Sequence, residues 1–163
     1  MKLTAPAAIA VEHDLSGFAC GVDGLDRWLK ARAIGNQKSG ASRTYVVCAA
    51  ARVMGYYALA SGGLATTEAI GKFRRNMPDP IPVAILARLA VDQQLFGQGV
   101  GRALFRDAAL RVLAAADVIG MRGLIVHAIS NDAVAFYRAL GLSASASEPR
   151  TLMITLDELR AAL

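Results

Sequence analysis

The sequence predicts a mixed α/β protein with a central sheet flanked by helices. Short runs rich in β-branched and aromatic residues alternate with segments that have the period of an amphipathic helix. A glycine-rich turn joins one of these strands to a helix past mid-chain. Hydrophobic residues make up 55% of the 163 residues, enough for one packed core, so we expect residues 1–163 to form a single domain.

The first part of the chain predicts a helix followed by a hairpin. Gly21–Ala33 has apolar residues at helical spacing, with charged residues between them. The runs Thr44–Ala50 and Val53–Ala60 are rich in β-branched and aromatic residues. Only Ala51 and Arg52 separate the two runs, so we expect them to pair as antiparallel strands.

The next segment combines signals that do not fit one regular element. Ser61–Pro82 contains SGG, the basic KFRR and the proline-rich MPDPIP, which predict a mobile or partly helical loop. The apolar run Val83–Val91 then has the length of a buried strand, while its alanine and leucine content leaves a helix open.

The second half predicts a helix over Val100–Ala116, with Leu104, Ala108 and Val112 on one face. A strand over Gly123–Ser130 follows it. The remaining elements are a short helix closed by Gly141, over Asn131–Leu142, and a last strand over Thr151–Leu156.

Composition narrows the classes of function. The net charge of +5 attracts polyanions such as RNA or CoA, although many basic proteins bind no nucleic acid. Cys20 and Cys48 lack CxxC spacing, and His13 and His127 are isolated, so we expect buried thiols and no metal site. No stretch approaches the roughly 18 apolar residues of a membrane span, and no signal-like region begins the chain. We therefore expect a cytoplasmic protein that does not bind membranes.

The most specific local feature is the turn between the strand and the helix. It consists of Gly97, Gln98, Gly99, Val100, Gly101 and Arg102. Glycines let the backbone turn tightly and present its N–H groups, and the helix N-terminus adds partial positive charge, so such a turn can bind a phosphate. It lacks the Gly-Lys-Ser/Thr of a Walker A loop, and its spacing and late position disfavour a dinucleotide fingerprint. A turn that merely links the strand to the helix is the remaining alternative.

The stretch LARLAVDQQLFGQGVGRALFRDA, which contains this turn, resembles the acetyl-CoA motif of the GNAT superfamily of N-acetyltransferases. The resemblance implies a GNAT fold and acetyl-CoA as co-substrate. It implies that the backbone of Leu89, Ala90 and Val91 binds the pantetheine arm and that the turn binds the pyrophosphate. Phe96 departs from the family pattern, because many relatives have Arg or Gln there.

A second stretch, AISNDAVAFYRALGL, resembles the later GNAT motif in which an Asn leads into a short helix carrying a Tyr. The resemblance implies that Asn131 contributes to cofactor binding and that Tyr137 is the general acid that protonates the departing CoA thiolate. Taken alone, Tyr137 is also explained as an aromatic on the apolar helix face with Val134 and Leu140, its hydroxyl reaching solvent. In this chemistry the substrate amine itself attacks the thioester, so no cysteine nucleophile is needed.

Outside these motifs, FACGVDGLDRWLKARAIGNQKSGASRTYVVC and FRRNMPDPIPVAILARLAVD resemble segments of the TacT-type toxins. This resemblance implies acetylation of the α-amino group of aminoacyl-tRNA, a ribbon-helix-helix antitoxin and a homodimer. An esterified α-amine is largely neutral at pH 7, so a strong protein base is unnecessary. The candidate tRNA contacts are Arg74 and Arg75 first, then Arg88, Arg43, Lys38 and Lys30.

Two other functions stay open from the sequence. One is a GNAT enzyme that acetylates a small-molecule amine or a protein N-terminus. The other is a catalytically idle GNAT-fold module that binds RNA or a protein. Acetyl transfer without tRNA, or no thioester consumption with any amine, distinguishes these from the toxin.

Overall fold

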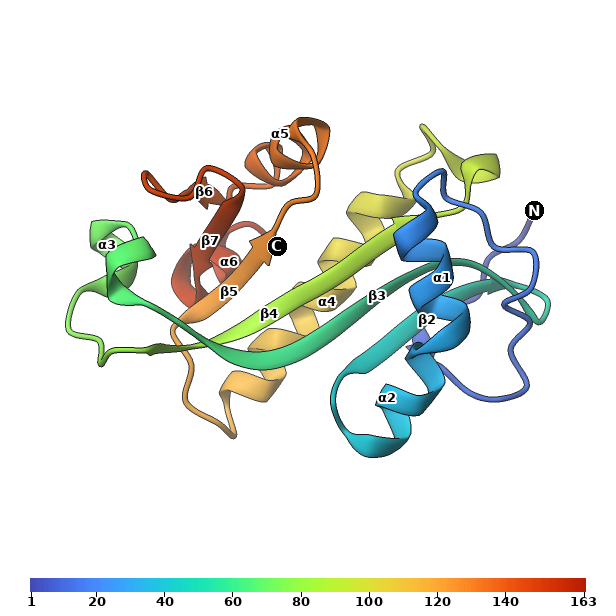
Figure 1. The fold of residues 1–163 in the computed structure, drawn as a ribbon, viewed down its shortest axis with the longest axis horizontal. Helices are drawn as coiled ribbons and strands as arrows, with labels where there is room; N and C mark the ends of the chain where they lie inside the picture. The colour runs from blue at the N-terminus through green and yellow to red at the C-terminus, as the bar shows by residue number, and fades with distance from the viewer. The chain divides into compact units, whose positions relative to one another are not determined.

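The structure is a computed structural model that describes residues Met1–Leu163, and it confirms the predicted α/β class (Figure 1). Its strands form a seven-stranded sheet in the order β1-β2-β3-β4-β5-β7-β6. The sheet is mixed, because β4 and β5 are parallel whereas β5 and β7 are antiparallel. The strands are β1 (Ala7–Ala8), β2 (Arg43–Ala49), β3 (Arg52–Leu64), β4 (Ile81–Val91), β5 (Gly123–His127), β6 (Ser143–Ala144) and β7 (Thr151–Thr155).

The chain also forms six α-helices and two 3-10 turns, of which α6 follows the last strand. The α-helices are α1 (Asp23–Ala31), α2 (Ala33–Ser39), α3 (Gly71–Arg74), α4 (Val100–Ala116), α5 (Asn131–Ala139) and α6 (Leu156–Ala161). The 3-10 turns are η1 (Thr66–Glu68) and η2 (Gln93–Leu95). None of the helices combines the length and apolar character that crossing a membrane requires.

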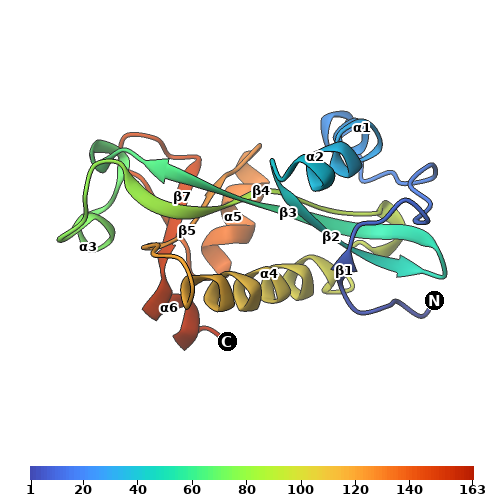
Figure 2. The same cartoon turned by 90° about the horizontal axis from the view of Figure 1, so that it is seen from below.

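The contacts within the chain group into two compact units, and the first comprises residues Met1–Ala60 and Ala87–Ala108. Here β2 and β3 pair antiparallel, with Tyr45 opposite Tyr57, as the predicted hairpin requires. Figure 2 shows α1 and α2 on one face of β2 and β3 and the start of α4 on the other. Leu29 of α1 and Tyr56 of β3 are fully buried in the cluster under α1 and α2, which forms the core of this unit.

The helix predicted over Gly21–Ala33 is α1, Asp23–Ala31, and a second helix, α2, follows it directly. Arg32 separates α1 from α2, with φ −122° and ψ −30°, which departs from helical geometry. Leu29 before this break and Ala33 after it are both completely buried. The second helix was not predicted because its sequence, AIGNQKS, has too few apolar residues to show a helical period.

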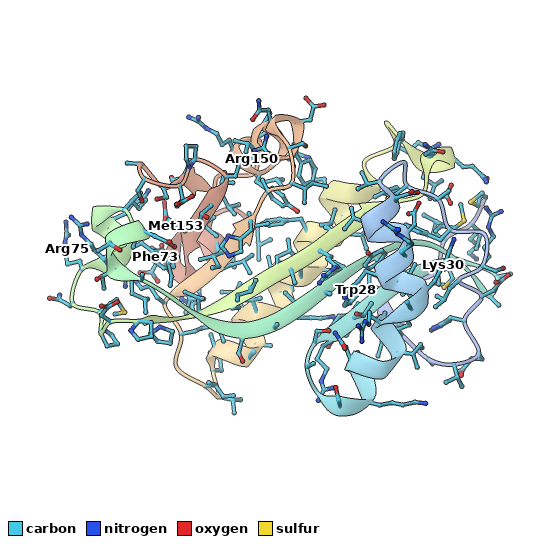
Figure 3. All side chains as sticks on the ribbon, viewed as in Figure 1. Trp28, Lys30, Phe73, Arg75, Arg150 and Met153 are labelled. Carbon is cyan, nitrogen blue, oxygen red and sulfur yellow. The ribbon has the colours of Figure 1, made fainter.

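The second unit comprises residues Ser61–Leu86 and Ala109–Leu163. Its core includes Phe73 of α3, which lies beside Met153 of β7 (Figure 3), and Ile81 and Ile125 from β4 and β5. The segment Ser61–Pro82 is partly helical as predicted, although β3 extends into it as far as Leu64 and β4 begins at Ile81. The apolar run Val83–Val91, which follows this segment and for which a helix stayed open, is a strand and lies in β4.

The helix predicted over Asn131–Leu142 ends at Ala139, and two predicted strand ends in this unit were wrong because a side chain caps the helix that follows. The strand predicted to end at Ser130 ends at His127, and the Ser130 hydroxyl instead accepts the Ala133 N–H (3.1 Å) at the start of α5. The strand predicted to include Leu156 ends at Thr155, because Thr155 and Glu158 form a reciprocal capping box that begins α6.

Candidate functional site

The glycine-rich turn after β4 has the backbone that the sequence predicted. Gly97 and Gly99 have φ of +78° and +80°, a region that residues with a Cβ rarely adopt. A Cβ built on either residue would have no heavy atom within 4 Å, so the turn is open on that side. Gly97, Gln98 and Gly99 are exposed to solvent, and α4 begins at the next residue.

Backbone amides gather at this turn without partners. The N–H groups of Gly97, Gly99, Val100, Gly101 and Arg102 donate to no carbonyl of the chain, and the first intrahelical bond of α4 runs from Ala103 to Gly99. No acidic residue lies in the first turn of α4. Free amides and the positive end of a 17-residue helix attract an anion, so the turn can bind a phosphate or pyrophosphate.

A buried carboxylate, Asp92, which was not predicted as a site residue, accepts hydrogen bonds from the backbone where the turn begins. Asp92 is 2% exposed; its Oδ1 accepts the Gln94 N–H (3.0 Å) and its Oδ2 accepts the Ala19 N–H (3.1 Å). Its own N–H donates to the Met54 carbonyl of β3 (2.8 Å). The Arg52 guanidinium lies 3.9 Å from Oδ2. An Asp directly after a buried strand was the available sequence signal, since such residues commonly cap the following turn.

The segment Leu89–Val91 at the end of β4 lies beyond the pairing of β4 with β5, which covers only Ala84 to Leu86. Ala90 is buried in the core of the first unit, whereas Leu89 and Val91 are half-buried. Backbone groups of a strand that extends past its neighbour can bind an extended ligand chain by added-strand hydrogen bonds.

Tyr137, in the second unit, is buried on α5. It is 6% exposed, and its ring packs edge-to-face against Phe136 at a centroid distance of 5.1 Å. This burial fits an aromatic packed on the apolar helix face as well as a catalytic tyrosine, so the role of Tyr137 stays a prediction. Burial raises the pKa of Tyr137 above its ordinary value, so the phenol keeps its proton at neutral pH. Asn131, at the start of the same helix, is exposed.

Both cysteines are buried and form no disulfide, as predicted. Burial raises the pKa of the Cys20 thiol to about 11, and the carboxylate of Asp26 beside it adds to this effect. Burial also raises the pKa of Cys48. Neither thiol is therefore ionised at neutral pH, which disfavours both as nucleophiles.

The six basic candidates differ in exposure. Arg88 is half-buried on β4, whereas the others are exposed. Two of the exposed candidates donate to backbone carbonyls of nearby residues. The Arg43 side chain donates to the Gln37 carbonyl (2.8 Å) and the Arg74 side chain to the Ala69 carbonyl (3.5 Å). The exposed candidates are Lys30, Lys38, Arg43, Arg74 and Arg75.

Comparison with known protein families matches residues 40–141 to the acetyltransferase (GNAT) domain. Among curated proteins, the chain is 45% identical over 158 residues to a tRNA-acetylating toxin of Mycobacterium tuberculosis. That match covers 97% of this chain and 95% of the relative.

Solved structures of two further toxins are similar over nearly their whole length. A mutant of KacT superposes with a TM-score of 0.92 at 26% identity, and the match covers 100% of both chains. AtaT complexed with acetyl-methionyl-tRNAfMet has a TM-score of 0.89 at 27% identity and 98% coverage of both chains. An AtaT mutant bound to the C-terminus of the antitoxin AtaR and to acetyl-CoA has a TM-score of 0.83 at 26% identity, covering 99% of this chain and 97% of that one.

Proposed function

This chain belongs to the GNAT family of acetyltransferases, and we propose that it transfers acetyl from acetyl-CoA to the α-amino group of an amino acid esterified to tRNA. The observation that carries the proposal is the 45% identity to a tRNA-acetylating toxin over 97% of the chain. The structural similarity to AtaT in complex with an acetylated aminoacyl-tRNA supports the same substrate class. A chain with this activity acts as a toxin, because an N-acetylated aminoacyl-tRNA cannot be used in elongation.

Acetyl-CoA binds, in this proposal, along β4 and the turn that follows it. The turn from Gly97 to Arg102, whose amides are free except that of Gln98, holds the pyrophosphate. The backbone of Leu89–Val91 holds the pantetheine arm. Asn131 contributes from the start of α5. Because these contacts are made by the backbone, Phe96, which is 58% exposed, can replace the usual polar side chain without removing the cradle.

The reaction needs one proton donor and no covalent enzyme intermediate. The neutral α-amine attacks the thioester carbonyl carbon, and backbone N–H groups of Leu89–Val91 stabilise the charge that develops on the oxygen. The C–S bond then breaks, and Tyr137 donates its proton to the departing thiolate. The amine releases its extra proton to water, and the Tyr137 phenolate regains a proton from water. A buried tyrosine that stays protonated at neutral pH suits the donor role.

The remaining parts of the proposal concern partners. The exposed basic residues Lys30, Lys38, Arg43, Arg74 and Arg75 contact the tRNA backbone, which fits the net charge of +5. A ribbon-helix-helix antitoxin neutralises the toxin; the structure of an AtaT mutant bound to the C-terminus of the antitoxin AtaR supports an antitoxin as partner. We also propose that residues 1–163 act as one domain, that the protein is a homodimer and that it works in the cytoplasm.

The deciding experiment measures transfer of labelled acetyl from acetyl-CoA to a total pool of charged tRNA, beside deacylated tRNA and a mixture of free amines. We expect label on charged tRNA alone. Label on free amines or protein N-termini would indicate the ordinary GNAT enzyme, and no label on any acceptor would indicate the idle module. Sorting the labelled tRNA by amino acid then identifies the preferred substrate.

A further inference from the structure

Arg88 of β4 belongs to a stacked column on the face of the sheet that α1 covers. Its guanidinium carbon lies 4.1 Å from the centroid of the Trp28 ring. Trp28 in turn stacks on Tyr56, with centroids 6.0 Å apart and planes 13° from parallel. The Tyr56 hydroxyl donates to the Leu25 carbonyl (2.8 Å), and Phe18 packs edge-on against the Tyr56 ring. The column is therefore rigid below the guanidinium.

The guanidinium itself has no polar partner. Arg88 is half-buried, yet it forms no hydrogen bond or ion pair within the chain. Other half-buried arginines behave differently: Arg52 lies near the Asp92 carboxylate, and Arg122 donates to the Phe73 carbonyl. Partial burial removes water from a group with five N–H donors, and the cation–π contact compensates only part of this loss.

Arg88 lies next to the part of β4 that is proposed to bind acetyl-CoA. Arg88 immediately precedes Leu89–Val91, the segment proposed to hold pantetheine. Side chains two residues apart on a strand share a face, and Ala90 packs in the same cluster as Trp28 and Tyr56. The guanidinium thus lies on the α1 face of β4, about 7 Å along the strand from Ala90.

An esterified amino acid limits what Arg88 can bind there. Its carboxyl group is consumed in the ester, so the nearest anion to the reacting amine is a phosphodiester of the RNA. A guanidinium that stacks one face on an indole ring keeps the N–H groups at its edge free. Two of these N–H groups can donate hydrogen bonds to two oxygens of one phosphate.

We propose that Arg88 binds the phosphodiester at the acceptor end of the aminoacyl-RNA and that Trp28 is the positioning residue that orients it. This inference rests on the proposed function. It separates Arg88 from the exposed lysines and arginines, which contact the RNA backbone at a distance from the amine. Arg88 instead aligns the ester with the thioester.

The test compares two acceptors that carry the same amino acid. One is a charged trinucleotide with the acceptor-end sequence of tRNA, and the other is aminoacyl-adenosine, which has no phosphate. For Arg88→Met we expect KM for the trinucleotide to rise about 10- to 100-fold, the loss of one charge-assisted contact. KM for aminoacyl-adenosine and the Kd of acetyl-CoA stay within about twofold of wild type.

Three further variants sharpen the comparison. Arg88→Lys keeps the charge but lacks the planar guanidinium with its paired N–H donors. We therefore expect log KM for the trinucleotide to rise by about one-third of the rise in Arg88→Met. Trp28→Leu keeps apolar bulk but removes the ring face, and it raises KM for the trinucleotide only. Arg106→Met is the charge-matched control, because Arg106 is exposed on α4, on the opposite face of the sheet, and it should change neither KM.

Salt dependence gives a readout that a structural role would not move. With intact charged tRNA, the slope of log KM against log salt should fall by about 0.7 to 0.9 in Arg88→Met relative to wild type. The same slope should be unchanged in Trp28→Leu, because that variant keeps the charge of Arg88.

Four outcomes would overturn the inference. These are equal losses on both acceptors, a weaker Kd for acetyl-CoA, a salt slope identical to wild type, and an Arg88→Met variant that matches Arg106→Met on the trinucleotide. If Arg88→Met unfolds, Arg88→Lys and Trp28→Leu decide by the same comparison. Failure of the proposed function is distinct, because wild-type protein would then acetylate neither aminoacyl acceptor.

Discussion

Replacing Gly99 with alanine tests the phosphate turn with little steric disturbance. The φ of +80° is unfavourable for alanine and costs about 1 kcal/mol, but the new Cβ would meet no heavy atom within 4 Å. Gly40 provides a matched control at the end of α2: its φ is +84°, and its nearest atom is Arg43 Nη2 at 3.9 Å. Each substitution should therefore lower Tm by about 2–4 °C.

The two variants should differ in ligand binding. The Gly99 amide and its neighbours are free to donate to a pyrophosphate, whereas the Gly40 amide is already bonded to the Asn36 carbonyl (2.9 Å). If strain at Gly99 turns even one amide away, a charge-assisted bond worth about 1.5–3 kcal/mol is lost. Acetyl-CoA should then bind Gly99→Ala about 10- to 100-fold more weakly, with no change in Gly40→Ala.

Calorimetric titration with acetyl-CoA measures both affinities, and thermal melts of the free proteins measure the strain. Titration with acetyl-pantetheine, which lacks the pyrophosphate, provides an internal check, because its weaker affinity should be equal in the two variants. Equal acetyl-CoA affinities for Gly99→Ala, Gly40→Ala and wild type would refute the assignment of the turn to the pyrophosphate.

Tyr137→Phe should lower kcat for acetyl transfer about 10²- to 10⁴-fold while the Kd of acetyl-CoA stays near wild type, and an unchanged kcat would exclude the general-acid role. Asp92→Asn should cost about 1–3 kcal/mol in urea unfolding, since the amide cannot accept both N–H groups that the buried carboxylate accepts; a wild-type midpoint would contradict this. Glu158→Gln should keep the helix cap but lose about 0.5 kcal/mol of ion pairing with Lys72, a partly exposed contact at 2.6 Å. Burial opposes ionisation of Glu158, but the bonds from Lys72 and the cap prevail and lower its pKa below the usual 4.5. The charge thus stabilises the fold above that usual value, and urea titrations should show the difference from Glu158→Gln vanish as the pH falls through the lowered pKa.

Features formed by a few consecutive residues could be predicted from local patterns in the sequence. The helix predicted over Val100–Ala116 has those bounds in the structure, and the hairpin around Ala51 and Arg52 pairs as predicted. The turn with Gly97 and Gly99 has the positive φ that its glycines suggested. In each case the signal and the structure lie within a few consecutive residues, so backbone sterics and hydrophobic period decide the outcome.

The α/β class, the acetyl-CoA motif and the family could all be predicted from the amino-acid sequence, because each depends on residues close together in the chain. The contacts between side chains that lie far apart in the sequence could be seen only in the folded chain. Asp92 meets the backbone of Ala19, and Arg88 meets Trp28 across 60 positions, and neither contact leaves a periodic trace in the chain. The contact of Arg88 with Trp28 depends on how α1 packs on the sheet. The burial that raises the pKa of Tyr137 on α5 likewise exists only in the folded chain.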